Sequence, residues 1–593
     1  DSALRVAVEL GRGQGWHRWI GDGEMIVLSR FGESAPPEEL ARHFGFTPEA
    51  IAERVRRALA SRHAAPLVVA ARPAAASAAA DARQRVLDGA VVERLVARDG
   101  TLFGNRHAAN VAKRLGWLDL PARSRIVLPT LRQLVAELVA DGVDTLYLLG
   151  MGGSSLGPEV LRVISGAPSG RRLVVADTTD ADRAAAMLDS FEPARSVVLA
   201  VSKSGTTAET AALQAILAQR LRDVFGDGAR RRLVALTEPA SALARQARGE
   251  GWRAVLTHPV DVGGRFSILS AVGLLPAIWL GLDADTFLAE GAHALARLEV
   301  DHPAVQLGHH MAAVCAEGWG KLAWCASPAL QPFGMWAEQL VAESTGKERH
   351  GILPVIVADP SRMEAWPHTL ALSPRFADED VTALDTGLER LIATGVPVVR
   401  WTLGRHQLAQ LFVGLELATA IAGWLLGVNP FDEPDVVRAK EQARAALAAG
   451  HREYPAPTLD PGAALAGFLD GIGADDAIVL LGWMVETADS AAALDGLAGR
   501  LAARHGVPVT TGFGPRYLHS TGQLHKGAPD RLRVVLLSGE PARDVPIPGQ
   551  AHTIGQLRWA QALGDLAALR EVARPVLHLH FGRDPIAGLS SLA

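Results

Sequence analysis

Short apolar runs and longer segments of helical length alternate along the middle of the chain. Four of the runs have the length of a β-strand and lie at 145–149, 173–176, 197–200 and 233–236. Runs that are apolar almost throughout are typical of strands buried on both faces, and the segments between them are long enough for crossover helices. The pattern therefore predicts an α/β fold with a parallel sheet flanked by helices.

Two further patterns extend this picture toward the carboxyl end. Apolar runs at 477–481, 534–537 and 576–580 predict another α/β domain. The stretch 412–428 is more apolar, but it has 17 residues, one of them Glu416, and is shorter than the roughly 20 residues that span a membrane. We expect it to be a buried helix.

The amino-terminal part has its own organisation. Apolar runs at 4–10 and 25–28 predict two strands, followed by helices, and Ala-, Arg- and Pro-rich sequence then predicts a linker. We expect five units: 1–60, a linker at 61–80, 81–285, 286–445 and 446–593.

Size, charge and cysteines exclude several classes of protein. A chain of 593 residues needs several cores, and a net charge of −5 gives no electrostatic reason to bind nucleic acid or an anionic membrane. The two cysteines, Cys315 and Cys325, form no CxxC pair, so no disulfide framework or cysteine metal site is indicated, and we expect a cytoplasmic protein. No signal-peptide pattern opens the chain, and the absence of an initiator Met leads us to expect a piece of something longer.

Candidate chemistry begins after the predicted strand at 197–200. The segment SKSGTT (202–207) places hydroxyl groups, one Lys and one Gly where a strand meets a helix. The free N–H groups of a helix's first turn add to such donors, so the segment suits a phosphate group. The alternative is an ordinary capped helix start.

A second turn of this kind, GMGGSSLGP (150–158), follows the strand at 145–149. Its glycines allow a ligand close to the backbone, and Ser154 and Ser155 add hydroxyl groups. A dinucleotide-binding turn is the competing interpretation, but Ser155 stands where that motif requires its third glycine. Two donor-rich turns after strands of one parallel sheet favour a phosphate site.

The second half contributes three more segments. GGRFS (263–267) is followed by a helical region, and Gln339 and Glu343 are four residues apart, which places them on one face of a helix. GVNPFDEP (427–434) is a proline-broken turn that leads into a helix carrying Lys440.

These blocks, together with AESTGK (342–347), resemble glucose-6-phosphate isomerases, over about residues 90–445. In detail the chain is most similar to the isomerase half of bifunctional transaldolase/isomerase proteins, including the tail segment RYLHSTGQLHKG (516–527). The resemblance implies two sugar-isomerase (SIS) domains with parallel sheets, a hexose 6-phosphate substrate, no cofactor or metal, and a homodimer whose active sites lie near the subunit interface.

The resemblance also implies roles for particular residues. Arg265 corresponds to the arginine that steadies the enediolate, Glu343 to the base, Gln339 to a substrate contact, and Lys440 to a lysine near the ring oxygen. The groups that hold the phosphate correspond to Ser154, Ser202, Ser204 and Thr207, with the backbone at Gly153 and Lys203.

The reaction explains why these residue types are needed. A carboxylate can carry one proton between C2 and C1, and a fixed cation stabilises the charge that develops on O1 and O2. Without the resemblance, Glu343 could instead form a surface pair with Lys347, and Arg265 could simply pack beside the glycines.

The chain departs from the family in two places. No pattern within 388–417 matches the family's ring-opening histidine, and none of His350, His368 and His406 is assigned that role. Glu433 stands where the family often has Gln, which adds a carboxylate that would weaken binding of an anion or pair with a cation.

The polar segment 517–526 is interpreted either as a structural loop or as a cover over the isomerase site that binds an anion. At the other end, the stretches 15–22, 29–36 and 44–50 resemble the carboxyl-terminal end of transketolase. This match covers about a tenth of the chain and implies either a fusion remnant or a truncated piece, without transketolase activity.

The predicted function is thus glucose-6-phosphate isomerase. Two alternatives stay open, a dual phosphoglucose/phosphomannose isomerase and a non-catalytic sugar-phosphate-binding regulator.

Overall fold

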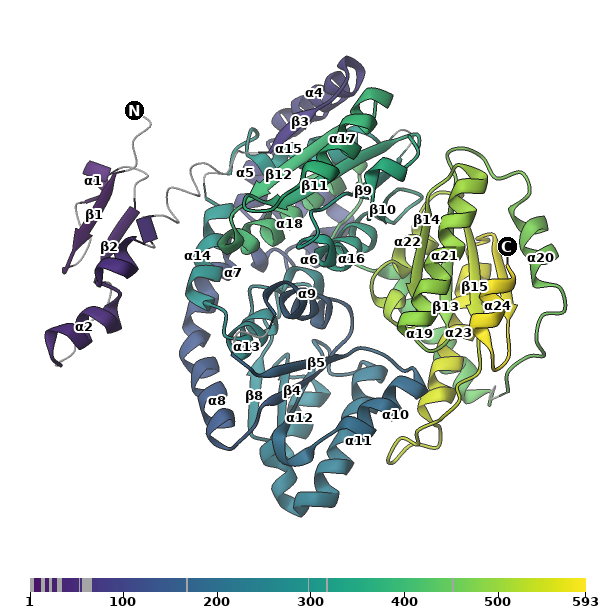
Figure 1. Cartoon of the computed structure of the whole chain (residues 1–593), viewed down its shortest axis with the longest axis horizontal. Coiled ribbons are helices and arrows are strands. Elements are labelled where there is room, and N and C mark those ends of the chain that lie inside the picture. Colours follow the sequence, from purple (N-terminus) through teal and green to yellow (C-terminus); the bar gives the residue numbers. More distant parts are fainter. Residues whose placement is uncertain are drawn as a thin grey trace.

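The computed structural model describes residues 5–11, 16–20, 24–28, 35–52, 54–55, 67–166, 169–296, 298–315, 318–450 and 453–592. The chain forms three mainly parallel sheets flanked by helices, and a small amino-terminal piece (Figure 1). The α/β class predicted from the apolar pattern is confirmed.

The first sheet has the strand order β5-β4-β6-β7-β8, with all neighbours parallel. Its strands are β4 (Thr145–Leu149), β5 (Arg172–Ala176), β6 (Ser196–Val201), β7 (Leu233–Thr237) and β8 (Ala254–Thr257). The four strands predicted in this region are present. Strand β8 was not predicted from the sequence, because its apolar run at 254–256 is only three residues long and only one of its four residues is buried.

Helices cover both faces of this sheet. Leu146 and Leu148 of β4 share a core with α8 (Leu128–Ala140) and α13 (Ala271–Leu280). Tyr147 and Leu149 point to the opposite face and pack with α11 (Ala208–Phe225), since side chains alternate along a strand. The loops at the carboxyl ends of the strands are therefore the place for a ligand.

The second sheet has the order β10-β9-β11-β12-β3. Its parallel strands are β9 (Trp319–Trp324), β10 (Gly351–Ile356), β11 (Thr369–Phe376) and β12 (Val398–Leu403). Strand β3 (Val68–Ala70) comes from far upstream and pairs antiparallel with β12 at the sheet edge.

The prediction of a linker at 61–80 is wrong for the part that the structure describes. Besides β3, helix α4 (Pro73–Asp88) begins there and packs against α15 (Pro303–Ala313). Alanine is the strongest helix former, and the inner positions Ala79, Ala82 and Val86 are buried. Alanine-rich sequence beside a sheet edge therefore folds as a helix.

Residues 412–426 of the apolar stretch lie in α18 (Leu408–Leu426), and Gly427 caps the helix at its carboxyl end. Helix α18 packs against α14 (Ala284–Ala294), α15 and α16 (Gly334–Thr345). The predicted buried helix is confirmed. Among the described residues, this one helix, taken over 405–426, is long and apolar enough to cross a membrane, and 89% of its apolar window is buried inside the protein.

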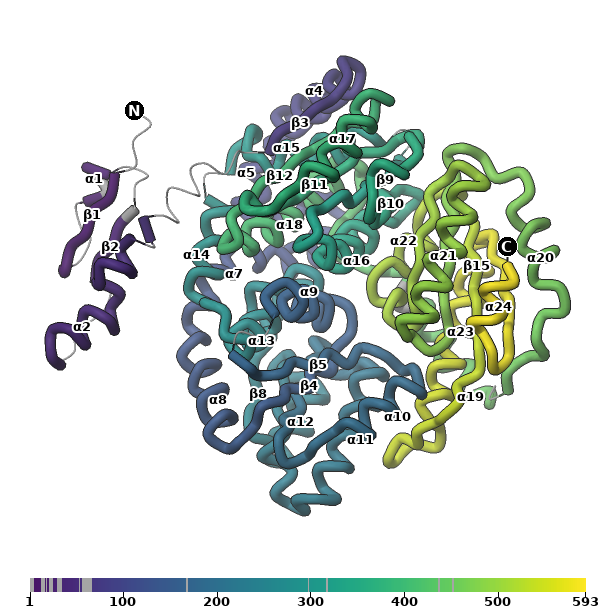
Figure 2. Tube along the Cα trace, viewed as in Figure 1, coloured from purple at the N-terminus to yellow at the C-terminus, as the bar shows by residue number. Residues whose placement is uncertain are grey.

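The third sheet, in the carboxyl-terminal part, has the order β14-β13-β15-β16 and is parallel. Its strands are β13 (Ala477–Trp483), β14 (Val509–Phe513), β15 (Leu532–Ser538) and β16 (Val576–His580), of which the sequence predicted all but β14. Helix α19 (Pro434–Ala448) packs along α23 (Ile554–Glu571) of this part, and the two run close together in Figure 2. The contact between α19 and α23 thereby places the third sheet beside the chain segment that carries Lys440.

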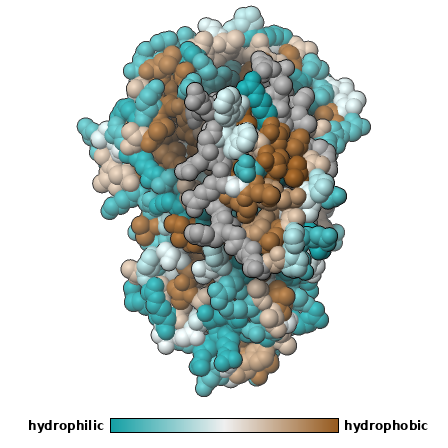
Figure 3. Space-filling model, turned by 90° about the vertical axis from the view of Figure 1, so that its left-hand side faces the viewer, coloured by the Kyte–Doolittle hydropathy of each residue, from teal (hydrophilic) through white to brown (hydrophobic). Residues whose placement is uncertain are grey.

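In the amino-terminal piece, β1 (Val6–Glu9) pairs in parallel with β2 (Glu24–Val27), and α1 (His17–Ile20) and α2 (Pro37–Phe44) belong to the same piece. Both expected strands are present, while residues 12–15, 21–23 and 29–34 of the amino-terminal part lie outside the described residues. Exposed apolar side chains occur in this piece, Trp19 among them, and Figure 3 shows brown patches between hydrophilic areas on the face turned to the viewer.

Candidate active site

The two donor-rich turns open into one cleft of about 590 Å³. All three parts of the fold contribute to its walls. The first sheet contributes the turns after β4 and β6, the second sheet contributes α16, and the carboxyl-terminal part contributes His519. The site residues expected from the sequence that line it are Gly153, Ser154, Ser202, Lys203, Ser204, Thr207, Arg265, Gln339, Glu343 and Lys440. The structure therefore brings the whole expected set together.

The SKSGTT segment forms a compact turn between β6 and α11. Ser202 Oγ lies 2.9 Å from Thr207 Oγ1 and accepts the N–H of Gly205 at 3.1 Å. Ser204 Oγ lies 2.9 Å from Thr206 Oγ1. These bonds shape the turn so that its hydroxyl groups gather at the amino-terminal end of α11, where backbone N–H groups are free to bind an anion.

Cations lie beside this turn. Lys203 Nζ donates to the carbonyl of Val262 at 2.7 Å and lies 3.6 Å from Glu238 Oε1. Burial lowers the pKa of Lys203 to about 8, and the neighbouring charge of Arg114 contributes to this lowering. Lys113 and Arg114 also line the cleft. Sequence reasoning missed both, because they precede the first strand and belong to none of the motif blocks.

The glycine-rich turn packs closely against two other site segments. Gly152 has a φ of +54°, and a Cβ there would lie 2.5 Å from the carbonyl oxygen of His519 and 2.7 Å from Nε2 of Gln339. A Cβ on Gly153 would lie 2.1 Å from the carbonyl carbon of Gly264. Only glycine allows this approach, which brings the 263–267 turn to the phosphate turn.

Arg265 is 4% exposed and is held on several sides. Its Nε donates to Ser344 Oγ at 2.8 Å, and its Nη2 donates to the carbonyls of Pro430 and Asp432 at 2.7 and 3.1 Å. The remaining nitrogen, Nη1, lies 3.3 Å from Glu433 Oε2 and 3.6 Å from Glu343 Oε2. Two of the three nitrogens thus fix the guanidinium group, and the third faces the carboxylates.

Glu433 therefore pairs with a cation, which was one of the two outcomes expected for it. Its side chain is 41% exposed, in contrast to the buried Arg265. The pair is for this reason open to solvent on one side.

Glu343 lies on α16, as the spacing predicted, one turn after Gln339. Gln339 Nε2 donates to Glu343 Oε2 at 3.0 Å and to the carbonyl of His519 at 2.7 Å. Burial raises the pKa of Glu343, and the charge of Arg265 opposes that rise. A buried carboxyl group with a raised pKa beside a fixed cation is suited to take up and return a proton.

Lys440 is exposed on α19 and lines the cleft. His350, His368 and His406, to which the sequence assigned no role, do not line it. His519 does line it. The interpretation of segment 517–526 as a cover over the site is supported here by the contact between Gln339 and His519, while its binding of an anion stays a prediction.

Lys526, at the end of the same segment, is placed differently. It is buried and forms an ion pair with Asp565 at 2.5 Å. The segment is also not a loop throughout, because η12 (Arg516–His519) and α22 (Gly522–Gly527) form within it. Among the described residues, no group of three or more His, Cys, Asp or Glu side chains could hold a metal ion.

Comparison with known sequences gives the family context. The sequence model of the Phosphoglucose isomerase family matches residues 136–348, and that of the transketolase-like TK C-terminal domain matches residues 1–47. The second match confirms the resemblance seen at the amino terminus.

Individual relatives cover more of the chain. Glucose-6-phosphate isomerase of Rubrobacter xylanophilus is 31% identical over 377 residues, which are 55% of this chain and 87% of the relative. That of Symbiobacterium thermophilum is 32% identical over 389 residues, 56% of this chain and 86% of the relative. The crystal structure of a hypothetical protein from Thermus thermophilus matches with a TM-score of 0.55 and 27% identity, over 64% of this chain and 100% of that one.

Proposed function

This chain belongs to the glucose-6-phosphate isomerase family, and on that premise we propose which step of the reaction each site residue performs. The chain is an aldose–ketose isomerase that interconverts glucose 6-phosphate and fructose 6-phosphate. The observation that carries the assignment of residues is that a phosphate-type turn and the pair of Arg265 and Glu343 share one cleft.

The phosphate group binds at the hydroxyl turn. Ser154, Ser202, Ser204 and Thr207 supply hydroxyl groups, with the backbone at Gly153 and Lys203 beside them. The phosphate is remote from C1 and C2, so its binding energy serves to place these carbons against Glu343 rather than to change their bonding.

Glu343 transfers the proton. As a carboxylate it removes the proton from C2 of the open-chain aldose, and as a carboxylic acid it returns that proton to C1. Gln339 holds Glu343 Oε2 at 3.0 Å and so limits the rotation of the carboxylate. A base positioned in this way contributes about 10²–10⁴-fold to the rate.

Arg265 stabilises the enediolate. Negative charge develops on O1 and O2 as the C2 proton leaves, and Nη1 is the guanidinium nitrogen that faces the carboxylates of the cleft. Since Nε and Nη2 are already bound to Ser344 and to backbone carbonyls, the cation needs no reorganisation when the charge appears. Lys440, which also lines the cleft, takes the place near the ring oxygen.

Three further points belong to the proposal. Residues 81–285 and 286–445 are the two sugar-isomerase domains, with β3 and α4 contributed to the second from upstream. The chain works as a homodimer with its sites near the subunit interface. It is a cytoplasmic enzyme of glycolysis and gluconeogenesis that requires neither a metal nor a cofactor.

A coupled assay of glucose 6-phosphate formation from fructose 6-phosphate tests this function. We expect turnover with the wild-type chain and its loss in Glu343→Gln. No turnover by the wild-type chain would favour the regulator, and comparable turnover of mannose 6-phosphate would favour the dual isomerase.

A further inference from the structure

A small cavity of about 100 Å³ lies beside the cleft, between the start of α11 and the helices α19 and α23. Its inner wall is buried, since Glu209, Ala439 and Leu557 are 3%, 6% and 4% exposed. A water molecule needs about 10–15 Å³ of such space, so the cavity has room for roughly seven to ten atoms of that size. A small organic molecule fits into it, whereas a hexose phosphate is too large.

Most of the wall of this small cavity is apolar. The apolar side chains come from α11, α19, η12 and α23, and they are Ala208, Ala439, Ala443, Leu447, Leu518 and Leu557. The polar side chains Ser204, Thr206, Lys440 and Arg444 are exposed and face its open side, the mouth. An apolar wall with a few polar groups at one end is typical of sites for small organic ligands.

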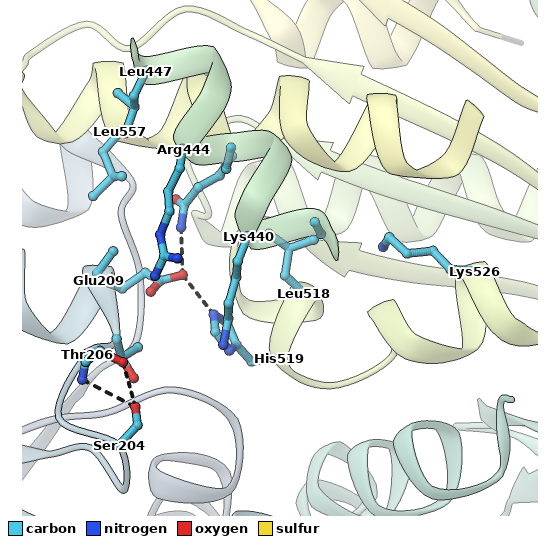
Figure 4. A pocket seen from close by; sticks show the side chains of 15 residues that line it. Ser204, Thr206, Glu209, Lys440, Arg444, Leu447, Leu518, His519, Lys526 and Leu557 are labelled. Atoms are coloured by element: carbon cyan, nitrogen blue, oxygen red, sulfur yellow. Dashed lines mark hydrogen bonds and ion pairs between the residues drawn. The ribbon is translucent and has the colours of Figure 1, made fainter. Parts of the chain in front are cut away.

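Two cations at the mouth are available to a ligand. Lys440 and Arg444 are one turn apart on α19, and Figure 4 shows both side chains extending from that helix in the same direction. Neither of them forms a hydrogen bond or an ion pair with any residue that the structure describes. Lys526 also lines the cavity, but it is paired with Asp565 at 2.5 Å.

Among the described residues that line the cavity, Glu209 is the one carboxylate, and it already has partners. His519 Nε2 lies 2.8 Å from Glu209 Oε1, and Gln561 Nε2 donates to the same oxygen at 2.6 Å. Burial raises the pKa of Glu209, but the charge of His519 and its hydrogen bond lower that pKa to about 2. The cavity thus has two unpaired cations at its mouth and one carboxylate bound on its inner wall, so it favours an anion.

The small cavity and the cleft have one wall in common. Ser204, Thr207, Lys440 and His519 line both of them. Ser204 and Thr207 are two of the hydroxyl groups proposed to hold the substrate phosphate. An anion in the small cavity therefore lies on the other side of the phosphate turn, where it competes for these hydroxyl groups and repels the phosphate. Each ligand should for this reason weaken the binding of the other.

We propose that the small cavity is an inhibitory site for a small organic carboxylate. The carboxylate group binds Arg444 and Lys440 at the mouth, because a planar guanidinium group matches a carboxylate with two parallel hydrogen bonds. A compact apolar body packs between Ala439 and Leu557. Arg444 and Leu557 do not line the cleft, so the site is distinct from that of the substrate. The inference goes beyond the proposed function, because it gives the chain a second ligand and a means of regulation.

Calorimetric titration of the full chain with benzoate tests the site. We expect saturable binding, and benzamide, a neutral compound of the same shape, should bind at least about tenfold more weakly because it cannot pair with a cation. Arg444→Met should weaken the binding of benzoate by about the same factor. Arg438→Met is the matched control, since Arg438 lies on the same helix, pairs with Glu571 and does not line the cavity.

The coupling between the two sites is measured with glucitol 6-phosphate, an open-chain compound that cannot react. Saturating benzoate should raise its Kd about tenfold, and saturating glucitol 6-phosphate should raise the Kd of benzoate by the same factor, since coupling between sites is reciprocal. In the coupled assay, the KM for fructose 6-phosphate should rise with benzoate and then level off. A KM that rises without limit would mean that benzoate binds in the cleft itself, which would overturn the inference.

Ala208→Phe provides a second variant, because Ala208 is exposed at the first position of α11 and lines only the small cavity. It should abolish benzoate binding, while KM without benzoate stays within about twofold of wild type in both Ala208→Phe and Arg444→Met. A wild-type affinity for benzoate in both variants would place benzoate elsewhere, and a strongly raised KM in Arg444→Met would make Arg444 part of the substrate site. Either result would refute the proposal.

The proposed function and this inference fail in different ways. If neither fructose 6-phosphate nor glucitol 6-phosphate binds, the proposed function is wrong, while the titration with benzoate still decides about the small cavity. If both sugar phosphates bind and benzoate does not, the proposed function stands and the inhibitory site is refuted.

Discussion

Replacing Glu343 by Gln tests the assigned base most directly. The substitution keeps the side-chain volume and the possibility of a contact with Gln339, but it removes the group that carries the proton. The expected loss of kcat is about 10²–10⁴-fold, which corresponds to about 3–5 kcal/mol of barrier.

The effect of this substitution on stability follows from two opposing interactions. At 3.6 Å, an effective dielectric constant of about 20 gives an attraction between Glu343 and Arg265 of about 5 kcal/mol. Burial of the carboxylate opposes it and is the larger influence, since the pKa of Glu343 is raised on balance. The folded protein thus favours the protonated form of Glu343. At a pH above the ordinary pKa of a glutamate, the ionised Glu343 side chain therefore destabilises the folded protein. Glu343→Gln should for this reason leave the free energy of unfolding unchanged or raise it by about 1 kcal/mol.

Three measurements check this reasoning. The coupled assay gives kcat, calorimetric titration with glucitol 6-phosphate gives a Kd that should stay within about threefold of wild type, and urea unfolding gives stability. Because the pKa of Glu343 is raised, kcat of the wild-type chain should fall as the pH drops toward that pKa, and the residual activity of Glu343→Gln should lack this decline. A kcat within tenfold of wild type, with binding intact, would refute the role of Glu343 as base.

Other perturbations separate the remaining parts of the site. Arg265→Ala should lower kcat about 10²–10³-fold and the free energy of unfolding by about 3–5 kcal/mol, because it leaves buried carboxylate and carbonyl partners unpaired. A variant that is as stable in urea unfolding and as active in the coupled assay as the wild type would contradict this. Gly152→Ala should impair activity far more than Gly142→Ala, since both have positive φ but only Gly152 lies against other site residues; equal kcat/KM values would argue against that close approach. Burial lowers the pKa of Lys203 to about 8, so its side chain loses its charge above that pH. The KM for the anionic substrate should therefore rise above pH 8 in the wild type and stay constant in Lys203→Met. Parallel pH profiles of KM in the two proteins would show that the Lys203 side chain does not bind the phosphate.

The sequence predicted those parts of the fold whose signal is local. The runs that became β4 and β6 are buried at every position, so their apolar character is visible without any knowledge of their neighbours. Strand β8 and the edge strand β3 are only four and three residues long, and most of these residues are only partly buried or exposed, so an apolar run as short as theirs does not by itself predict a strand. Their pairing partners, and not their own side chains, make them strands.

The same distinction applies to the site. Arg265 and Glu343 lie in blocks that could be recognised one at a time, and the resemblance indicated their roles. Arg114 and His519 carry their signal only in three dimensions, since each reaches the cleft from a segment remote from the motif blocks of the isomerase domains. The density of polar residues at 517–526 did point to His519, but not to its buried partner Glu209.

The pairing of β3 with β12 affects how the chain can fold during synthesis. Ala70 pairs with Val398, so the edge of the second sheet waits for about 330 further residues to be made. At roughly 5–20 residues per second this takes on the order of tens of seconds, during which the first sheet can fold and the segment from β3 through α4 has no partner strand. We therefore expect nascent chains that stop before β12 to be sensitive to protease at β3, although their first sheet is already folded and α4 can already pack against α15.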